Sequence, residues 1–256
     1  MEITLANMAI LVALCMMAML YSSVGHGGAS GYLAILSLTA FASNDSAWLK
    51  QHAWSLNLLV AGLAFYAYRK RGFFDLNLAL PFVIASVPAA IIGGYLRVDG
   101  EIYDSLLSIT LLFAAWKLYS IKQENTELSI SNTPPLYLSL SIGAVIGLFS
   151  GIVGVGGGIF LSPLILILGW GDVKTTAGVA ALFVWVNSAA GLIGSGLSGQ
   201  LVIEFDTLIP FGLSVFIGGY IGSKYGVDVF SQDTVKKLLV VVLLIAATKR
   251  LIEIVS

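Results

Sequence analysis

The stretch GIVGVGGGIFLSP, residues 151–163, places five glycines between two apolar segments. Glycine in a helix interior costs roughly 1 kcal/mol relative to alanine. Contiguous glycines lie on every face of a helix, which a single packing seam does not need. We therefore predict that Gly154, Gly156, Gly157 and Gly158 interrupt a helix rather than line one side of it.

The composition of the chain indicates whether this break lies in water or in a membrane. Hydrophobic residues make up 58% of the 256 residues, charged residues 11%, and the mean hydropathy is +0.94. A soluble domain has about 25% charged residues, so this chain could not cover a soluble surface. The sequence predicts an all-α integral membrane protein, and its net charge of −1 argues against a nucleic-acid partner.

Few residues are available for a metal or cofactor site. The chain has two histidines and one cysteine, Cys15, which lies in an apolar run and is interpreted as a packing residue. We expect no cofactor, no metal and no disulfide. The N-terminal residues lack the basic region of a signal peptide and are expected to remain as a first helix.

Polar breaks divide the chain into about ten apolar segments, and a helix that crosses the bilayer needs ~20 such residues. The segments fall near 3–24, 29–42, 47–68, 76–96, 102–119, 136–153, 157–170, 175–198, 205–223 and 235–254. Segments 29–42 and 157–170 are short, so the sequence leaves open whether they span or are re-entrant. The polar stretch 122–135 is expected to be an extramembrane linker between a first repeat, 1–121, and a second repeat, 136–256.

The two repeats resemble each other in sequence. GHGG at 25–28 lies 129 positions before GVGG at 154–157, and the same shift relates Pro81 to Pro210 and Gly93 to Gly222. LFAAWK at 112–117 matches LIAATK at 244–249 with a shift of 132. Internal duplication of this kind is common in secondary transporters.

The distribution of Lys and Arg indicates how the repeats are oriented. Five passes per half place nine of the 13 basic residues on one side, whereas four passes divide them 7 to 6. Basic loops stay in the cytoplasm. We therefore expect two inverted five-segment repeats in a bacterial cytoplasmic (inner) membrane, with both termini outside and the Arg69-Lys70-Arg71 loop and the linker inside. A re-entrant hairpin in each half gives the same parity.

A glycine break between apolar segments prepares an anion site. Irregular backbone in a bilayer is tolerated only where protein or a watery cavity surrounds it. The first amides of the helix that follows have no internal partners, and the positive end of the helix dipole attracts an anion. The first repeat supplies a second break over residues 25–31, which includes Gly25, His26, Gly27 and Gly28, and inversion would bring the two breaks together near the midplane.

Other glycines are spaced for packing. Gly143, Gly147 and Gly151 recur every four residues, as do Gly218, Gly222 and Gly226. Small residues at this spacing let two membrane helices approach closely. We expect these two rows to pack helices, without contact with a ligand.

Polar residues near the breaks are candidate substrate contacts. Asn57 and Asn187 occupy near-equivalent places in the repeats, each shortly after a tryptophan, Trp54 or Trp185. An amide in hydrocarbon faces the bundle interior, so each asparagine either bonds a neighbouring helix or donates hydrogen bonds to an oxyanion. The tryptophans are candidates for the same site or for interface anchors.

Four further residues have both a structural and a functional interpretation. Ser22, Ser23 and Ser150 precede the breaks, where a hydroxyl caps freed backbone groups or contacts substrate. His26 either makes a structural hydrogen bond or carries a proton coupled to transport. The lysines near helix ends, Lys117 and Lys249, are expected to extend toward the membrane interface.

The glycine motif GIVGVGGGIFLSPLIL resembles the signature of the TauE/SafE family, the sulfite exporter or toluene-sulfonate uptake permease family. ALFVWVNSAAGLIG at 181–194 and GGYIG at 218–222 extend the resemblance, and GHGGASGYL with HAWSLNLL carries a weaker copy in the first half. His26 replaces an apolar residue of the motif, and Ala34 stands where Pro163 would fall. The resemblance implies transport of small sulfur-containing anions such as sulfite or organosulfonates.

Three functions compete on these observations. The first is a secondary transporter of a small anion that works by alternating access, with a coupled proton as one further partner. The second is a passive anion channel. The third is an intramembrane enzyme, because GLSG at 196–199 fits a serine-protease pattern, but both histidines lie upstream of that serine. We expect no enzyme activity. The substrate, direction, coupling ion and oligomeric state, monomer or homodimer, stay open at this point.

Overall fold

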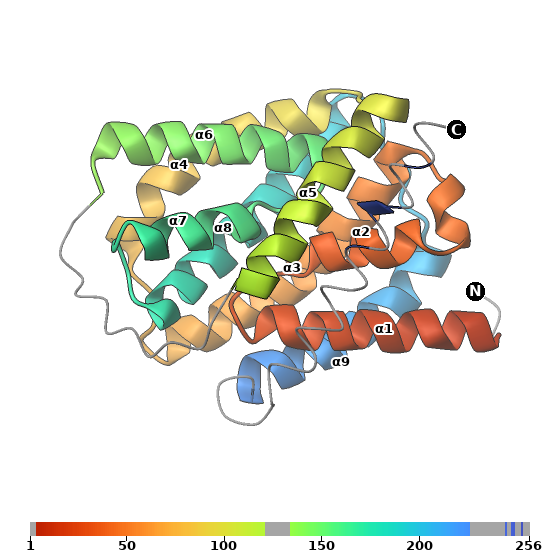
Figure 1. Cartoon of the computed structure of the whole chain (residues 1–256), viewed down its shortest axis with the longest axis horizontal. Helices are drawn as coiled ribbons and strands as arrows, with labels where there is room; N and C mark the ends of the chain where they lie inside the picture. The colour runs from red at the N-terminus through yellow and green to blue at the C-terminus, as the bar shows by residue number, and fades with distance from the viewer. Residues whose placement is uncertain (1–3, 121–133, 226–243, 245–246, 249–251, 253–256) are drawn as a thin grey trace.

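The computed structural model describes residues 4–120, 134–225, 244, 247, 248 and 252, and its regular structure within them is helical (Figure 1). The elements are α1 (Leu5–Ser22), α2 (Ala29–Ser37), a 3-10 turn η1 (Ala40–Ser43), α3 (Ser46–Lys70), α4 (Leu76–Tyr95), α5 (Gly100–Ser120), α6 (Leu136–Val153), α7 (Gly158–Ile167), α8 (Val173–Leu197) and α9 (Phe205–Tyr225). The all-α prediction is confirmed.

Five of these helices are long and apolar enough to cross a membrane: α1, α4, α6, α8 and α9. Helices α2 and α7 have nine and ten residues and are too short to do so. The count of ten segments is not established, because segment 235–254 falls largely outside the described residues. Most of the linker at 122–135 lies outside them as well.

Aspartates fix where three of the long helices begin. Asp45, Asp75 and Asp172 are the N-cap residues of α3, α4 and α8, and each carboxylate accepts a hydrogen bond from a backbone amide of the first turn. Such a cap stabilises a helix by about 1 kcal/mol. These acids therefore mark helix ends.

Two pairs of parallel helices pack through the glycine rows. A Cβ at Gly143, Gly147 or Gly151 of α6 would lie 2.4 Å from a carbonyl oxygen of α4. In the same way, a Cβ at Gly218 or Gly222 of α9 would lie 2.0 or 1.9 Å from a carbonyl oxygen of α1. In each pair the residue numbers of successive contacts increase along both helices, so the two helices run parallel. The packing interpretation of both rows is confirmed, except for Gly226, which lies outside the described residues.

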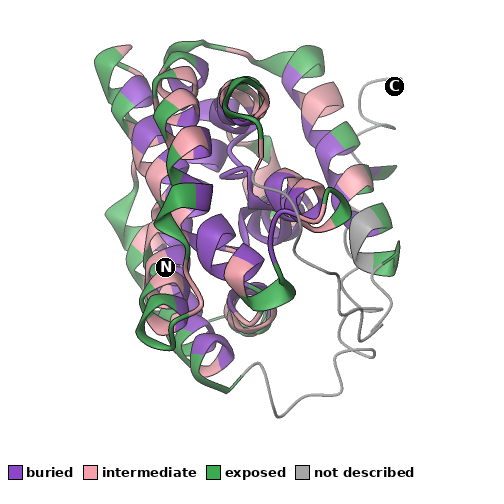
Figure 2. Cartoon of the chain, turned by 90° about the vertical axis from the view of Figure 1, so that its left-hand side faces the viewer, coloured by how far each residue is buried: buried purple, intermediate pink, exposed green. Residues whose placement is uncertain are grey.

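Helices α3 and α8 form an antiparallel pair at the centre of the molecule. Gln51 of α3 bonds Ser195 of α8, and Asn57 further along α3 bonds Ser188 earlier in α8. In the most apolar 18-residue stretch of α8, 67% of the residues are buried, against 28–39% in the other four candidate spans. Figure 2 shows buried residues on the inner sides of the helices and exposed residues on their outer sides. This central pair carries the residues that the breaks contact.

Candidate functional site

Both predicted breaks are present. Helix α1 ends at Ser22 and α2 begins at Ala29, while α6 ends at Val153 and α7 begins at Gly158. Five glycines inside the two gaps adopt left-handed backbone that side chains disfavour: Gly25, Gly28, Gly154, Gly156 and Gly157, with φ between 75° and 102°. The prediction of glycine-broken helices is confirmed at both places.

Each break packs against the first turns of the long helix from the other half of the chain. A Cβ at Gly25 would lie 2.0 Å from the carbonyl oxygen of Ala177 in α8. A Cβ at Gly154 would lie 2.6 Å from the Cβ of Lys50 in α3. The absence of side chains therefore lets the irregular backbone lie directly on α3 and α8.

Asn57 lies between the two breaks and contacts both. Its Oδ1 accepts a hydrogen bond from the Ala29 amide at 3.0 Å, and its Nδ2 donates to the Ser188 hydroxyl at 3.2 Å. A Cβ at Gly27 would lie 2.3 Å from Oδ1, and one at Gly156 would lie 2.7 Å from Nδ2. With the amide oriented by this network, its acceptor faces the first break and its donor faces the second.

Asn187 does not occupy the place equivalent to Asn57. The residue of α8 that faces Gly27 and Gly156 beside Asn57 is Val184, whose Cγ1 would lie 2.9 Å from a Cβ at either glycine. Helices α3 and α8 each have 25 residues and start 127 positions apart, and this shift relates Asn57 to Val184. The expectation of near-equivalence, made with a shift of 129, is wrong in register.

The contacts of Asn187 are asymmetric. Its Nδ2 donates to the Phe183 carbonyl one turn earlier in α8, at 2.8 Å. Its Oδ1 is buried and has no hydrogen-bond partner among the described residues. The interaction with a neighbouring helix that the sequence suggested for this side chain is therefore not made.

His26 connects the first break to α7. Its Nδ1 lies 2.9 Å from the Val24 carbonyl oxygen and its Nε2 lies 3.2 Å from the Ser162 hydroxyl. A Cβ at Gly158 would lie 3.0 Å from the imidazole Cδ2. Because a carbonyl only accepts, Nδ1 donates and Nε2 accepts from Ser162 in a neutral ring.

The three serines before the breaks differ in their partners. Ser22 donates to the carbonyls of Met19 and Gly219, and Ser23 donates to the carbonyl of Leu20. The hydroxyl of Ser150 is buried without a hydrogen-bond partner among the described residues. Ser22 and Ser23 thus satisfy freed backbone carbonyls, which is the structural interpretation, while Ser150 keeps an unused donor.

The two tryptophans lie in different surroundings. Trp54 is fully buried, and a Cβ at Gly191 of α8 would lie 2.6 Å from its six-membered ring. Its indole Nε1 has no partner among the described residues. Trp185 is 41% exposed. Only Trp54 is enclosed within the protein.

The helices that follow the breaks differ at their N-termini. The first amide of α2 is occupied by the Asn57 oxygen. Helix α7 begins after Gly157, and no side chain caps it. The residues that lead into its first turn, Val155 to Gly158, are buried. Among the described residues no side chain accepts from the Gly158 and Ile159 amides of α7, whereas the first amide of α2 is already engaged by Asn57.

Sequence reasoning missed four residues that contact the breaks: Lys50, Ser162, Val184 and Ser188. Val184 had no signal in the sequence, because the shift of 127 follows only from where α3 and α8 begin in the structure. Ser188 directly follows Asn187, and its position next to that candidate residue was the one signal in the sequence. Lys50 carried no local signal, since its place beside Gly154 arises only when distant segments pack.

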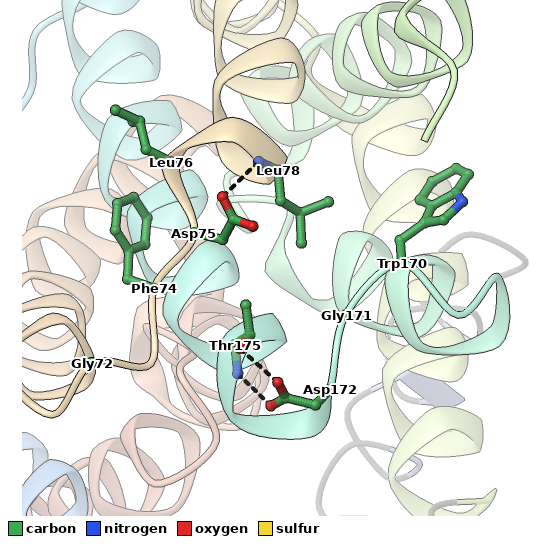
Figure 3. Close-up of a pocket in the computed structure, with 9 residues that line it drawn as sticks. All are labelled: Gly72, Phe74, Asp75, Leu76, Leu78, Trp170, Gly171, Asp172 and Thr175. Atoms are coloured by element: carbon green, nitrogen blue, oxygen red, sulfur yellow. Dashed lines mark hydrogen bonds between the residues drawn. The ribbon is translucent and has the colours of Figure 1, made fainter. Parts of the chain in front are cut away.

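Two cavities lie near the ends of the helices. One of about 360 Å³ lies between the start of α4 and the loop before α8, and it includes the N-cap residues Asp75 and Asp172 (Figure 3). None of its lining residues belongs to a break. The other, of about 310 Å³, is lined in part by Asp45, Asp99 and Tyr103. The Tyr103 hydroxyl donates to the Val153 carbonyl at 3.3 Å, so this second cavity adjoins the α6–α7 break.

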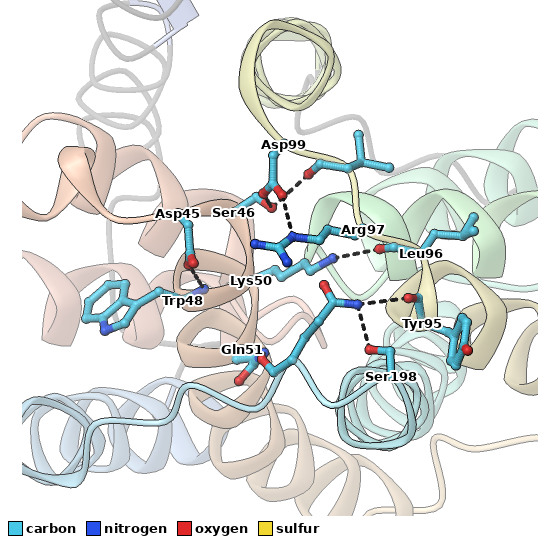
Figure 4. A network of polar contacts seen from close by, with 12 residues as sticks. Asp45, Ser46, Trp48, Lys50, Gln51, Tyr95, Leu96, Arg97, Asp99 and Ser198 are labelled. Atoms are coloured by element: carbon cyan, nitrogen blue, oxygen red, sulfur yellow. Dashed lines mark hydrogen bonds and ion pairs between the residues drawn. The ribbon is translucent and has the colours of Figure 1, made fainter.

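A polar network surrounds the second cavity (Figure 4). The Ser46 hydroxyl donates to the Asp99 carboxylate, and Arg97 pairs with the same carboxylate at 2.9 Å. The hydrogen bond from Ser46, aided by Arg97, lowers the pKa of the Asp99 carboxyl although partial burial opposes the shift. The carboxylate therefore stays charged at neutral pH beside the start of α3.

Comparison with known proteins gives a consistent match. The family described as Sulfite exporter TauE/SafE matches residues 9–250. A probable membrane transporter protein, y4hK, of Sinorhizobium fredii is 33% identical over 243 residues, which cover 94% of this chain and 96% of that protein. A probable membrane transporter protein, ORF9, of a Sinorhizobium species is 28% identical over 200 residues, covering 77% of this chain and 75% of that protein. No solved structure matches significantly.

Proposed function

The chain belongs to the TauE/SafE family and is a membrane transporter, and from this premise we propose that it carries a small sulfur-containing anion, sulfite or an organosulfonate, by alternating access. The anion is held at the N-terminus of a broken helix inside the bundle. The substrate class follows from the family description, while the place of binding follows from the breaks. The membrane is the bacterial cytoplasmic membrane, with the Arg69-Lys70-Arg71 loop in the cytoplasm and both termini outside.

The helix packing supports two inverted repeats. The third helices of the two halves, α3 and α8, have equal lengths of 25 residues and run antiparallel. The first helix of each half packs in parallel on the fourth element of the other, α1 on α9 and α6 on α4. An exchange of this kind is what a two-fold axis in the membrane plane would produce. Rocking of one repeat against the other would then expose the breaks to each side in turn.

The orientation of Asn57 is the observation that carries the anion site. Its donor, Nδ2, faces Gly156 of the second break, where the first turn of α7 has no side-chain cap. Helix N-termini with free amides bind anions. We place the anion there, against Gly154, Gly156, Gly157 and Gly158, with Asn57 donating to it.

In this proposal the residues of the first break line the other side of the anion site. Gly25, Gly27 and Gly28 allow His26 to reach Ser162 of α7, and the neutral ring is positioned to exchange a proton during transport. The substrate is an alternative proton carrier, because sulfite also protonates near neutral pH. Ser150, Trp54 and Asn187 have buried polar atoms that find no partner in the described part of the chain, and in this proposal they contact the substrate. The contacts of Ser22, Ser23 and Trp185 do not support such a role.

A flux assay tests this function against a passive anion channel. Purified protein in proteoliposomes should accumulate sulfite or methanesulfonate against its gradient when a pH gradient is imposed. A channel would only dissipate the anion gradient and would follow voltage. Anion movement that ignores the pH gradient and tracks voltage alone would replace the transporter proposal with the channel.

Replacement of Asn187 by leucine separates a binding role from a structural one. Since Asn187, within the described residues, bonds only its own helix and leaves Oδ1 unpaired, Asn187→Leu should keep the melting temperature of the free protein within a few degrees. Binding of the transported anion should weaken by about tenfold if the side chain contacts it. Thermal melts with and without sulfite measure both quantities, and an unchanged anion response would remove Asn187 from the site.

A further inference from the structure

Lys50 is a buried cation directly beside the second break. It lies in the second turn of α3 and is fully buried. The backbone of Gly154, with φ of 96°, packs against its Cα and Cβ. The corresponding contact of the first break, between Gly25 and Ala177, involves an alanine. The charge is therefore present at one break alone.

The ammonium group of Lys50 makes no ion pair among the described residues, although the carboxylates of Asp99 and Asp45 attract it from farther away. Its Nζ donates one hydrogen bond, to the Leu96 carbonyl at 3.3 Å (Figure 4). Among the described residues the one ion pair joins Arg97 to Asp99, so the nearby carboxylate is already engaged by other partners. An ammonium has three donors and no acceptor. Burial of such a group is unfavourable unless it is paired.

Trp54 places a second unused donor near the same point. Its indole ring lies one turn further along α3, with the Lys50 Nζ 5.9 Å from the ring centroid. Its Nε1 is buried without a hydrogen-bond partner among the described residues. Lys50, which lies beside Gly154, and Trp54, which lies beside Gly191, thus both present buried donors, and the missing component is an acceptor with negative charge.

We propose that Lys50 and Trp54 form an anion-binding position next to the α6–α7 break, in which an oxyanion such as sulfite or a sulfonate accepts hydrogen bonds from Nζ and Nε1. The anion takes the place of the Leu96 carbonyl as the main partner of the ammonium. This inference rests on the proposed transport of an anion and adds a residue that neutralises its charge. It also predicts a preference for anions, since a neutral analogue leaves the ammonium unpaired.

A structural role makes a different prediction. Leu96 is the C-cap residue of α4, and a cation at a helix C-terminus stabilises that helix. If Lys50 only held the end of α4, its loss would destabilise the free protein and leave the anion response intact. The two roles are therefore separable by measuring stability and anion binding on the same variants.

The test uses the full chain in detergent with sulfite and methanesulfonate as probes. Lys50→Met keeps the length of the side chain and removes its charge, and Trp54→Phe removes the indole donor. Lys174→Met is the matched control, because Lys174 lies in the first turn of α8 and is exposed. Melting temperature is measured with and without each anion, and binding by titration calorimetry.

We expect Lys50→Met to melt within a few degrees of the wild type without anion and to bind both anions at least about tenfold more weakly. Trp54→Phe should weaken binding less, and Lys174→Met should behave as the wild type. A Lys50→Met protein that is destabilised yet responds normally to anion would overturn the inference and leave the transport proposal standing. A wild-type protein that responds to neither anion would instead reject the proposed substrate class.

Discussion

Replacement of Gly156 by leucine is expected to abolish anion flux while the protein still inserts in the membrane. Gly156 adopts φ of 77°, which costs a residue with a Cβ roughly 1–2 kcal/mol. The new Cβ would also lie 2.7 Å from the Asn57 Nδ2 and 2.9 Å from the Val184 Cγ1. Those neighbours are side chains that can shift. Leucine would therefore occupy the space in front of α7 and turn the Asn57 donor away from it.

Gly169→Leu provides a matched control for this prediction. Gly169 has a similar backbone, with φ of 66°, but a Cβ there would have nothing within 4 Å. Both variants carry the strain of left-handed backbone, and only Gly156→Leu alters the break. Flux in proteoliposomes should disappear for Gly156→Leu and persist for Gly169→Leu, with similar reconstitution of both. Wild-type flux in Gly156→Leu would rule out an anion path through this break.

Replacement of Gly147 by alanine should damage folding itself. A Cβ at Gly147 would lie 2.4 Å from the carbonyl oxygen of Ser86 and 2.6 Å from its Cα. These are backbone atoms of α4, so the clash can be relieved only by moving α6 and α4 apart. Overpacking at such a site costs about 1–3 kcal/mol or more, and the same shift would disturb the neighbouring contacts of Gly143 and Gly151. We expect a large fall in melting temperature and in the yield of monodisperse protein.

Gly212→Ala tests whether the effect comes from the clash or from the loss of a helical glycine. Gly212 lies inside α9, and a Cβ there would meet only the Leu59 Cδ1 at 3.4 Å, an ordinary contact. Alanine favours a helix by about 1 kcal/mol over glycine, so this variant should be neutral or stabilised. Equal behaviour of Gly147→Ala and Gly212→Ala in a thermal melt would contradict the packing role assigned to the α6 row.

The sequence predicted the features that depend on neighbouring residues. Charged residues are too few for a soluble surface, which fixed the membrane class, and clustered glycines located both breaks. The fourfold spacing of Gly143, Gly147 and Gly151 identified a packing row without its partner. Each of these conclusions needs only local backbone preference or composition, because a glycine carries its freedom of φ wherever the chain takes it.

The candidate site depended on contacts between distant segments. The shift of 129 that aligns the glycine motifs differs from the shift of 127 that aligns α3 with α8. The shift of 127 makes Val184 the counterpart of Asn57, whereas Asn187 lies 130 positions after Asn57. Sequence alone cannot favour one shift over the other, because insertions in the connecting loops change the register of each helix separately.

The sequence by itself determined that this protein lies in a membrane, that it is helical and where two of its helices are interrupted. The tertiary structure alone decided which side chains meet at those places. Asn57 turns its donor toward the second break because α3 packs antiparallel to α8, and Lys50 is buried because Gly154 has no side chain to keep α3 away. Local backbone preference acts between neighbours in the chain, whereas burial and hydrogen-bond pairing are set by segments that lie far apart in the sequence.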